Sequence, residues 1–463
     1  MTDLIKKRQR LAFVMLATVQ STLIFTIALI MVPLPKIAAE FGLVPTDVLL
    51  LQVAYGLPFS GLLLFGGRLA DRYGGRRMFV LGLLVFGAAS GIAAAAPSYE
   101  VLAAMRFLQG VAGALIAPAA MSVLHRLFPD AKDFGRAMAT WGGVSVLGAI
   151  LGFIVSGIAT SWVSWRWMFA VPILVALIAL MTTSMLLPRD SNENSVARPP
   201  LDLLGALLAT GGIVLGSYGL IMTGDHSWTS TPVLVPLTAS AILLTVFFVA
   251  EGKMRDPLLP PSFLADSCRI TGLFGMMLAA VGSIAIEYIL SLYLQQVRGW
   301  SPLMTTLAFL PFAVVLIATN HLSPALVGRF GAAQTTIGGL IIAALGLGLL
   351  AGLTGGASYL VGVMPGTVLV AVGMSLMFSG SAVLSMTNVP LRQAGLAGGV
   401  MNTAMELGPT VGLAVLMSVA ARQDDVVRGY GWAFAATSLF YIVLALVAVR
   451  SSRQGACAAM ARG

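Results

Sequence analysis

The sequence predicts an all-α membrane protein with about fourteen transmembrane helices, and three features lead to this fold class. Of its 463 residues, 58% are hydrophobic and only 10% are charged, which is too little charge for the surface of a soluble protein. Its apolar runs reach the roughly 20 residues that a helix needs to cross hydrocarbon. Backbone groups in lipid must bond within their own segment, so these runs predict helices, and the alternating segments of a β-barrel are missing from the sequence.

The expected spans fall into blocks of six, two and six. The first block, residues 1–187, is an N-terminal six-helix bundle with spans at 11–34, 47–68, 77–96, 99–126, 135–158 and 166–187. Residues 188–268 are a two-helix insertion, with spans at 201–222 and 231–251 between polar and Pro-rich cytoplasmic linkers. Residues 269–463 are a C-terminal six-helix bundle and a short tail, with spans at 270–297, 302–322, 333–353, 358–386, 395–420 and 430–450.

Lysine and arginine set the expected orientation. With the N-terminus in the cytoplasm and alternating spans, most basic residues fall on the cytoplasmic side, as the positive-inside rule requires. The exceptions that fall outside are Lys36, Arg166, Arg298, Arg422 and Arg428. The net charge of +9 therefore indicates an anionic lipid surface rather than nucleic acid as the partner. We expect a multi-pass protein of the cell membrane with both termini cytoplasmic, and with Cys268 and Cys457 reduced on that side.

Eleven residues between the second and third spans, GRLADRYGGRR, concentrate charge in an otherwise apolar region. Gly67 and Gly74 allow close approach and a sharp turn, and Asp71 can bond the N-terminal end of another helix. This pattern predicts a conformational latch, whose members are Gly67, Asp71, Arg72, Gly74, Arg76 and Arg77. A shorter echo, LVGRFG at 326–331, occupies the equivalent place in the C-terminal block and predicts two related halves.

The 67–77 loop resembles the signature loop between the second and third helices of major facilitator transporters. Further resemblances lie at 106–114 (RFLQGVAGA), 165–169 (WRWMF), 292–303 (LYLQQVRGWSPL) and 394–408 (AGLAGGVMNTAMELG). Together they resemble the fourteen-span drug:proton antiporters, the EmrB/QacA-like multidrug exporters. This resemblance implies a major facilitator fold, with two pseudo-symmetric six-helix bundles plus two extra helices, and transport by alternating access.

Arg106 and Gln109 lie within the fourth span. Arg106 is about 10 Å in from the outer end, where a charge costs a few kcal/mol unless it is paired or hydrated. The resemblance implies a cavity-facing arginine that tunes a nearby acid. The alternative is an arginine that extends to the outer interface and keeps its charge in water.

Two acids, Glu287 and Glu406, lie deep in their spans, whereas the other acids lie near span ends. Glu406 is about 21 Å along a helix from Arg392, close to the middle of the membrane, and Asn402 shares its face. A carboxyl at this depth can bind and release a proton or hold a cationic drug. The drug:proton antiporters usually have glutamine at this position, so the resemblance does not imply a role for Glu406. Its proposed role is based on its depth in the membrane and on the chemistry of a carboxyl group. The alternative for both acids is a structural hydrogen bond.

Other side chains are candidates for lining the cavity or for close helix packing. The expected cavity-lining residues are Thr18, Thr22, Thr26, Tyr55 and Gln295. The three threonines share a helix face, and their alternative is back-bonding to the preceding turn. The expected packing and helix-break residues are Gly148, Gly152 and Gly157 in the fifth span and Gly408, Pro409 and Gly412 in the thirteenth. The antiporter motif has proline where Phe153 stands, which suggests that the helix break has moved to Pro409.

These features predict a monomeric, proton-coupled exporter of lipophilic drugs, antibiotics or related small molecules. The sequence has no Gly-x-x-x-x-Gly-Lys-Ser/Thr loop, so we expect the proton gradient rather than ATP as the energy source, with no cofactor or metal. No nucleophile–base set lies within the spans, which argues against an enzyme. Two alternatives remain: proton-coupled uptake of a small metabolite, and a membrane sensor that has lost transport.

Overall fold

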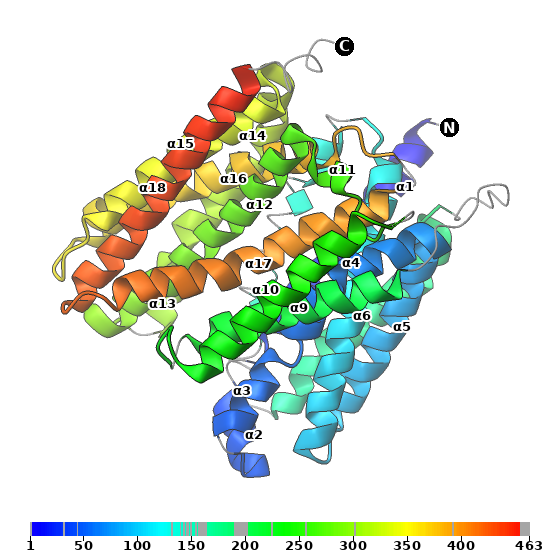
Figure 1. Ribbon diagram of the computed structural model, residues 1–463, viewed down its shortest axis with the longest axis horizontal. Helices are drawn as coiled ribbons and strands as arrows, with labels where there is room; N and C mark the ends of the chain where they lie inside the picture. The colour runs from blue at the N-terminus through cyan, green and yellow to red at the C-terminus, as the bar shows by residue number, and fades with distance from the viewer. Residues whose placement is uncertain are drawn as a thin grey trace.

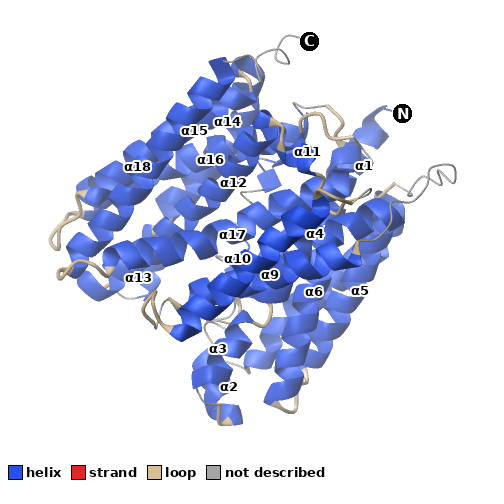
Figure 2. Cartoon of the chain, viewed as in Figure 1, coloured by secondary structure: helices blue, strands red, loops and turns tan. Residues whose placement is uncertain are grey.

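The computed structural model is helical throughout the residues that it describes (Figure 1, Figure 2). These residues are 2–30, 33–43, 45–130, 133–138, 140, 141, 144, 148, 151, 152, 155, 164–188, 202–223, 226–254, 257–300, 302–390 and 393–453. Within them, twelve helices are long and apolar enough to cross a membrane. The structure therefore confirms the all-helical bundle, with twelve candidate spans rather than fourteen.

The difference from fourteen concerns two predicted spans. Residues 47–68 were expected to form one span, but a turn after Val53 divides this region into α3 (Pro45–Val53) and α4 (Gly56–Tyr73). The predicted span at 135–158 lies mostly outside the described residues. Tyr55, in this turn, is fully buried.

The N-terminal bundle occupies the lower right of Figure 1. Its other elements are α1 (Thr2–Ala28), α2 (Leu34–Phe41), α5 (Gly75–Ala94), α6 (Tyr99–Leu127), a 3₁₀ turn (Trp165–Phe169) and α8 (Ala170–Leu186). Helices α4 and α5 pack on α6, and α8 packs on α1 and α5. A buried core of aliphatic and aromatic side chains joins these helices.

The C-terminal bundle lies at the upper left of Figure 1. Its helices are α11 (Pro261–Leu264), α12 (Ser267–Ile284), α13 (Pro302–Ala308), α14 (Leu310–Phe330), α15 (Ala332–Ala351), α16 (Met364–Met386) and α18 (Val426–Arg453). Wider π-helical turns occur at Ala285–Leu290, Tyr293–Val297 and Tyr359–Val363. Cys268 is disulfide-bonded, which contradicts the expectation of a reduced thiol, and Cys457 lies outside the described residues.

Helix α17 (Ala394–Ala420) and the insertion lie where the two bundles meet. Helix α17 packs on α12 and α18 of one bundle and on α4 and α6 of the other. The insertion consists of α9 (Leu203–Met222) and α10 (Thr231–Glu251), and α9 contacts both α4 and α17. The insertion therefore rests through α9 against the junction between the bundles (Figure 1).

The turns at the ends of α4 and α14 have the same structure, as expected from their shared sequence. Gly74 has φ 100° and ψ 136°, and Gly331 has φ 85° and ψ 158°. Gly74 donates its amide hydrogen to Ala70 O at 2.9 Å, and Gly331 donates to Val327 O at 2.8 Å. Positive φ favours glycine at both positions. We call the end of the molecule that carries these turns the basic end, and the start of α1 and the end of α18 also lie there (Figure 1).

A charged clamp ties α2 to the start of α8 at the opposite end. Glu40 accepts hydrogen bonds from Trp165 Nε1 and Arg166 Nη1, both at 2.7 Å. Arg166 also donates to Ala96 O at 3.1 Å, and its guanidinium lies 4.4 Å from the ring centre of Trp165. The hydrogen bond from Trp165 and the charge of Arg166 hold the pKa of Glu40 below its ordinary value, against a smaller opposing effect of burial.

This clamp predicts a small, pH-dependent loss of stability in Glu40→Gln. Because its pKa is lower in the folded state, Glu40 stabilises the fold above its unfolded pKa, and this contribution disappears as the pH falls through the folded value. Its side chain is 41% exposed, so we expect the neutral-pH Tm to fall by only about 1–2 °C. Thermal unfolding of the purified protein at neutral and acid pH measures this difference, with Asp424→Asn as an exposed control. An equal Tm decrease at both pH values would contradict the assignment.

Candidate functional site

Asp71 joins the two bundles at the basic end. Its Oδ1 accepts a hydrogen bond from Gly395 N at 2.6 Å, and its Oδ2 accepts one from Leu396 N at 2.8 Å. These amides begin α17, so a carboxylate lies at the positive end of a helix dipole. We call Asp71, Gly395 and Leu396 the Asp71 latch. It connects the last turn of α4 to the first turn of α17.

Glycines let the two backbones meet at this latch. A Cβ on Gly67 would lie 2.4 Å from Gly395 O, and a Cβ on Gly395 would lie 2.4 Å from Gly67 O. Farther along α17, a Cβ on Gly399 would lie 2.7 Å from Leu63 O. Only glycine permits this separation, so the basic end of the junction is closed by direct backbone packing.

The remaining residues of the signature loop surround the turn after α4. The Arg72 guanidinium lies 5.5 Å from the ring centre of its neighbour Tyr73, and Gly74 ends the helix. Arg76 and Arg77 lie in the first turn of α5, where Arg77 is exposed. In the echo of this loop, Arg329 lies 5.3 Å from the ring of Phe330 in the same way.

Arg106 is fully buried, in contrast to both expectations from the sequence. Its Nη1 donates to Thr26 O at 3.0 Å and to Gln109 Oε1 at 3.2 Å. Gln109 Nε2 donates in turn to Ser90 Oγ at 2.8 Å. A carbonyl and an amide oxygen therefore stabilise the guanidinium, which neither faces an open cavity nor extends to the membrane surface. Ser90 was not among the predicted site residues, and its only signal in the sequence is that it is a lone hydroxyl in the apolar third span.

Tyr55 packs against Arg106 and lies within electrostatic range of Glu406. The Arg106 guanidinium lies 4.9 Å from the ring centre of Tyr55, whose hydroxyl donates to Leu23 O at 3.2 Å. Phe59 stacks on the same ring with the ring centres 5.6 Å apart. Tyr55 is also close enough to Glu406 of α17 for an electrostatic interaction. Although Tyr55 was expected to line a cavity, it is fully buried between a cation and an acid.

Glu406 is half-buried at the junction of the bundles. Asn402, one turn earlier, is 3% exposed and donates to Gly398 O of its own helix at 2.8 Å rather than to Glu406. Within the part of the chain that the structure describes, no hydrogen-bond donor contacts the Glu406 carboxyl group. An acid in apolar surroundings without a fixed donor can exchange a proton or accept a polar ligand.

Glu287 lies in different surroundings. It belongs to a π-helical turn after α12 and accepts a hydrogen bond from Ser283 Oγ of the preceding turn. Gln295, in the next π-helical turn, is exposed and donates to Ser291 Oγ at 2.9 Å. Single π-helical turns frequently occur at functional sites, because they shift the register of the side chains. Each of these side chains bonds within its own helix.

The threonines on one face of α1 donate hydrogen bonds to backbone carbonyls of the preceding turn, which was the alternative to lining a cavity. Thr22 Oγ1 donates to Thr18 O at 2.8 Å, and Thr26 Oγ1 donates to Thr22 O at 2.7 Å. Thr26 is fully buried and Thr22 is 5% exposed, whereas Thr18 is exposed. The carbonyl of Thr26 binds Arg106, so this residue supports the site through its backbone.

The packing glycines occupy matching positions in the two halves. A Cβ on Gly148 would lie 2.4 Å from Ser21 O of α1, and a Cβ on Gly408 would lie 2.4 Å from Met277 O of α12. Gly412 similarly faces Val281, Gly152 is buried, and Gly157 lies outside the described residues. The expected break at Pro409 is absent from α17, which continues from Ala394 to Ala420, because neighbouring helices can accommodate an internal proline.

A second buried polar cluster lies in the C-terminal bundle, and none of its residues was among the predicted site residues. Ser375 of α16 donates to Asn320 Oδ1 of α14 at 2.5 Å, and Ser323 Oγ lies 3.0 Å from Ser375 Oγ. All three residues are at most 6% exposed. Asn320 and Ser323 are one helical turn apart in an apolar span, which was the available signal.

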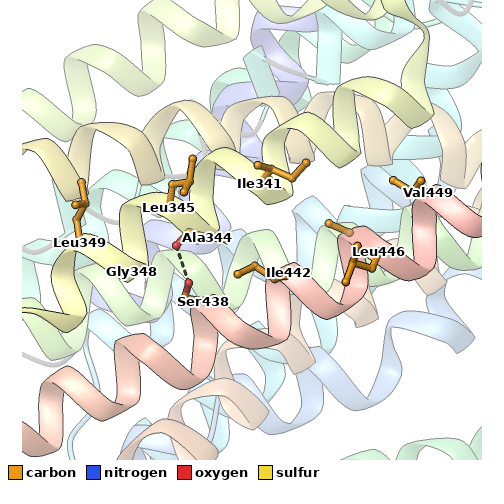
Figure 3. Close-up of a pocket in the computed structure, with 10 residues that line it drawn as sticks. Ile341, Ala344, Leu345, Gly348, Leu349, Ser438, Ile442, Leu446 and Val449 are labelled. Atoms are coloured by element: carbon orange, nitrogen blue, oxygen red, sulfur yellow. Dashed lines mark hydrogen bonds between the residues drawn. The ribbon is translucent and has the colours of Figure 1, made fainter.

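An apolar groove of about 520 Å³ lies between α15 and α18, away from the residues described above (Figure 3). Its lining residues are Ile341, Ala344, Leu345, Gly348, Leu349, Ser438, Ile442, Ala445, Leu446 and Val449. Ser438 Oγ donates to Ala344 O at 2.7 Å, so the one hydroxyl of this lining is satisfied by backbone. The groove contains none of the residues predicted to take part in transport.

Two helical bundles, joined by the Asp71 latch and by the packing of α17 on both, are typical of membrane transporters built from two related halves. The family model of the Major Facilitator Superfamily matches residues 14–413, and the chain belongs to this family. The family consists of transporters, which confirms the expectation that the chain is not an enzyme.

Known relatives and solved structures agree with this assignment. The chain is 33% identical to puromycin resistance protein pur8 of Streptomyces alboniger, over 92% of this chain and 88% of that protein. It is 32% identical to cephamycin export protein CmcT of Amycolatopsis lactamdurans, over 94% of this chain and 91% of that protein. The crystal structure of the human organic anion transporter MFSD10 shares the fold, with a TM-score of 0.70, 17% identity, and coverage of 95% and 99%.

Proposed function

We propose that the chain exports lipophilic small molecules, antibiotics among them, in exchange for protons. The observation that carries this proposal is Glu406, a half-buried acid at the junction of the two bundles, within electrostatic range of Tyr55 and with no donor among the described residues. Relatives named for puromycin resistance and cephamycin export support the direction and the kind of cargo.

In the proposed cycle, a proton and the cargo bind in turn at the junction of the two bundles. Protonation removes the charge of Glu406 and so lowers the cost of closing apolar surroundings around it. The Asp71 latch holds the basic end closed while the opposite end exchanges its contents. One charge that crosses 100 mV supplies about 2.3 kcal/mol, which is enough to drive export against a gradient.

The proposed cargo is uncharged or carries one positive charge. The residues near Glu406 are mainly apolar, and the partly buried Met405 offers a flexible surface for varied shapes. Thr26 stands where related drug exporters often have an acid in the first helix, so the site has fewer negative charges for a dication.

We further propose fourteen spans, with both termini cytoplasmic, and a monomer that belongs to the drug:proton antiporter subfamily. Helix α4 and residues 135–158 would add two spans to the twelve candidates. The basic end would then face the cytoplasm, in agreement with the distribution of lysine and arginine.

An efflux panel tests this function. Cells that express the chain should tolerate puromycin better than cells with an empty vector, and should retain less of it. An uncoupler should remove both effects. Higher cellular retention on expression would instead favour the uptake alternative. Unchanged retention with well-expressed protein, across neutral and cationic compounds, would favour the sensor alternative.

A further inference from the structure

Two buried acids meet at the basic end of the two-helix insertion. Asp202 caps α9, and its Oδ1 accepts a hydrogen bond from Gly205 N at 2.7 Å. Glu251 ends α10, and its Oε2 accepts one from Leu259 N at 2.9 Å. Asp202 is 8% exposed and Glu251 is 1% exposed. Each acid therefore uses one carboxyl oxygen to hold a nearby backbone amide.

The second oxygen of each carboxyl group faces the other acid. Asp202 Oδ2 and Glu251 Oε1 are buried and have no hydrogen-bond donor among the described residues. Both oxygens nevertheless lie beside the same point next to Gly205, which brings the two carboxyl groups together. A Cβ on Gly205 would lie 2.2 Å from Asp202 Oδ2 and 2.4 Å from Glu251 Oε1, so glycine leaves the space in which the oxygens meet.

This contact needs a proton. Ionised carboxylates only accept hydrogen bonds, so two of them in contact would repel each other and leave two buried oxygens without a donor. One proton makes one oxygen a donor and the other an acceptor, and it removes one negative charge from the pair. We propose that Asp202 and Glu251 form a proton-binding site, separate from Glu406, that holds one proton between Oδ2 and Oε1.

The site is connected to the helix that carries the Asp71 latch. Arg68 of α4 donates from Nε to Leu258 O at 2.7 Å and from Nη2 to Pro257 O. Residues 257–259 are thus held by Arg68 through two carbonyls and by Glu251 through the Leu259 amide. A second contact, Thr210 Oγ1 to Gly61 O at 2.9 Å, joins α9 to α4.

The charged groups that act on Glu251, among the described residues, are Asp202 from α9 and Arg68 from α4. Loss of the shared proton would leave two negative charges in contact and draw Arg68 away from the carbonyls of residues 257–259. The proton would therefore set how firmly the insertion is attached to α4. This assignment does not depend on the direction of transport or on the identity of the cargo.

Two measurements on the purified full-length protein test the proposal. Infrared difference spectra between acid and alkaline pH should contain the carbonyl stretch of a protonated carboxylic acid, and Glu251→Gln should remove part of this signal. The Tm of the wild type should fall as the pH rises from about 5 to about 8, because the pair loses its proton. Glu251→Gln should lose most of this pH dependence, because its amide donates to Asp202 without titrating.

The controls decide between the possible outcomes. Asp202→Asn should behave like Glu251→Gln, whereas Asp424→Asn, an exposed acid in the α17–α18 loop, should keep the wild-type pH dependence. Wild-type pH dependence and infrared signal in both pair variants would overturn the proposal. Failure of both variants to fold at acid pH would also overturn it, because an amide mimics the protonated acid. A Tm that rises with sodium chloride but not with choline chloride, and only when both acids are present, would indicate a metal cation instead.

Discussion

Glu406→Gln is expected to abolish export while folded protein remains in the membrane. Glutamine keeps the size and polarity of the side chain but cannot bind and release a proton. A carrier without this exchange loses the driving force of about 2.3 kcal/mol per 100 mV, which corresponds to about a 50-fold cargo gradient. Whole-cell efflux of puromycin, compared at equal protein levels in the membrane, measures the loss.

Glu287→Gln is the matched control for this prediction. Both acids lie within predicted spans, but Glu287 accepts a hydrogen bond from Ser283, whereas Glu406 has no donor among the described residues. We therefore expect Glu287→Gln to retain more export than Glu406→Gln. Counterflow of labelled cargo in proteoliposomes without a proton gradient should persist in Glu406→Gln, because cargo can still exchange. Efflux at the wild-type level in Glu406→Gln would remove this residue from the coupling mechanism.

Asp71→Ala is expected to open the basic end and to reduce export by at least about tenfold. It removes two charge-assisted hydrogen bonds to the start of α17, each worth about 1.5–3 kcal/mol. Their loss would change the ratio of closed to open molecules by a factor on the order of 100 or more. Spin labels at Pro129 and Phe330, exposed residues near the basic ends of the two bundles, should report longer and broader distances.

Asp71→Asn provides a graded control for the latch. It keeps one oxygen acceptor but loses the charge and the second acceptor, so its export should lie between those of the wild type and Asp71→Ala. Replacement of Gly395 by alanine should open the same end by a steric route, since the new Cβ would lie 2.4 Å from Gly67 O. Wild-type distances and wild-type export in Asp71→Ala would show that the contact does not hold the closed state.

Local patterns predicted those parts of the fold that depend on neighbouring residues. The apolar runs gave the positions of most helices, since a lipid-embedded backbone must bond within its own segment. The Arg-aromatic-Gly pattern shared by residues 72–74 and 329–331 predicted two related halves, and the structure has matching turns at Gly74 and Gly331, where a positive φ favours glycine. The division of the second predicted span into α3 and α4 was missed, because its apolar sequence has the composition of one continuous span.

The candidate site depended more on contacts between distant residues. The sequence indicated that Asp71 could bond a helix N-terminus, but it could not identify α17, which begins 323 positions later at Ala394. Arg106 was expected in a cavity, yet Thr26, Gln109 and Tyr55 surround it. Asp202 and Glu251 were taken for ordinary acids at span ends, because nothing local indicates that α9 and α10 bring them together.

The sequence by itself determined that the protein is a helical membrane transporter, which acids lie deep in its predicted spans and where its signature loop lies. These features depend on hydrophobicity, charge and glycine geometry, which act over a few residues or a single span. The tertiary structure alone decided which groups contact each other. It determined that Asp71 binds the start of α17, that Arg106 is buried, and that Asp202 lies beside Glu251. Partner choice depends on shape and close backbone packing between whole helices, and the order of residues along one helix does not encode which neighbour it will contact.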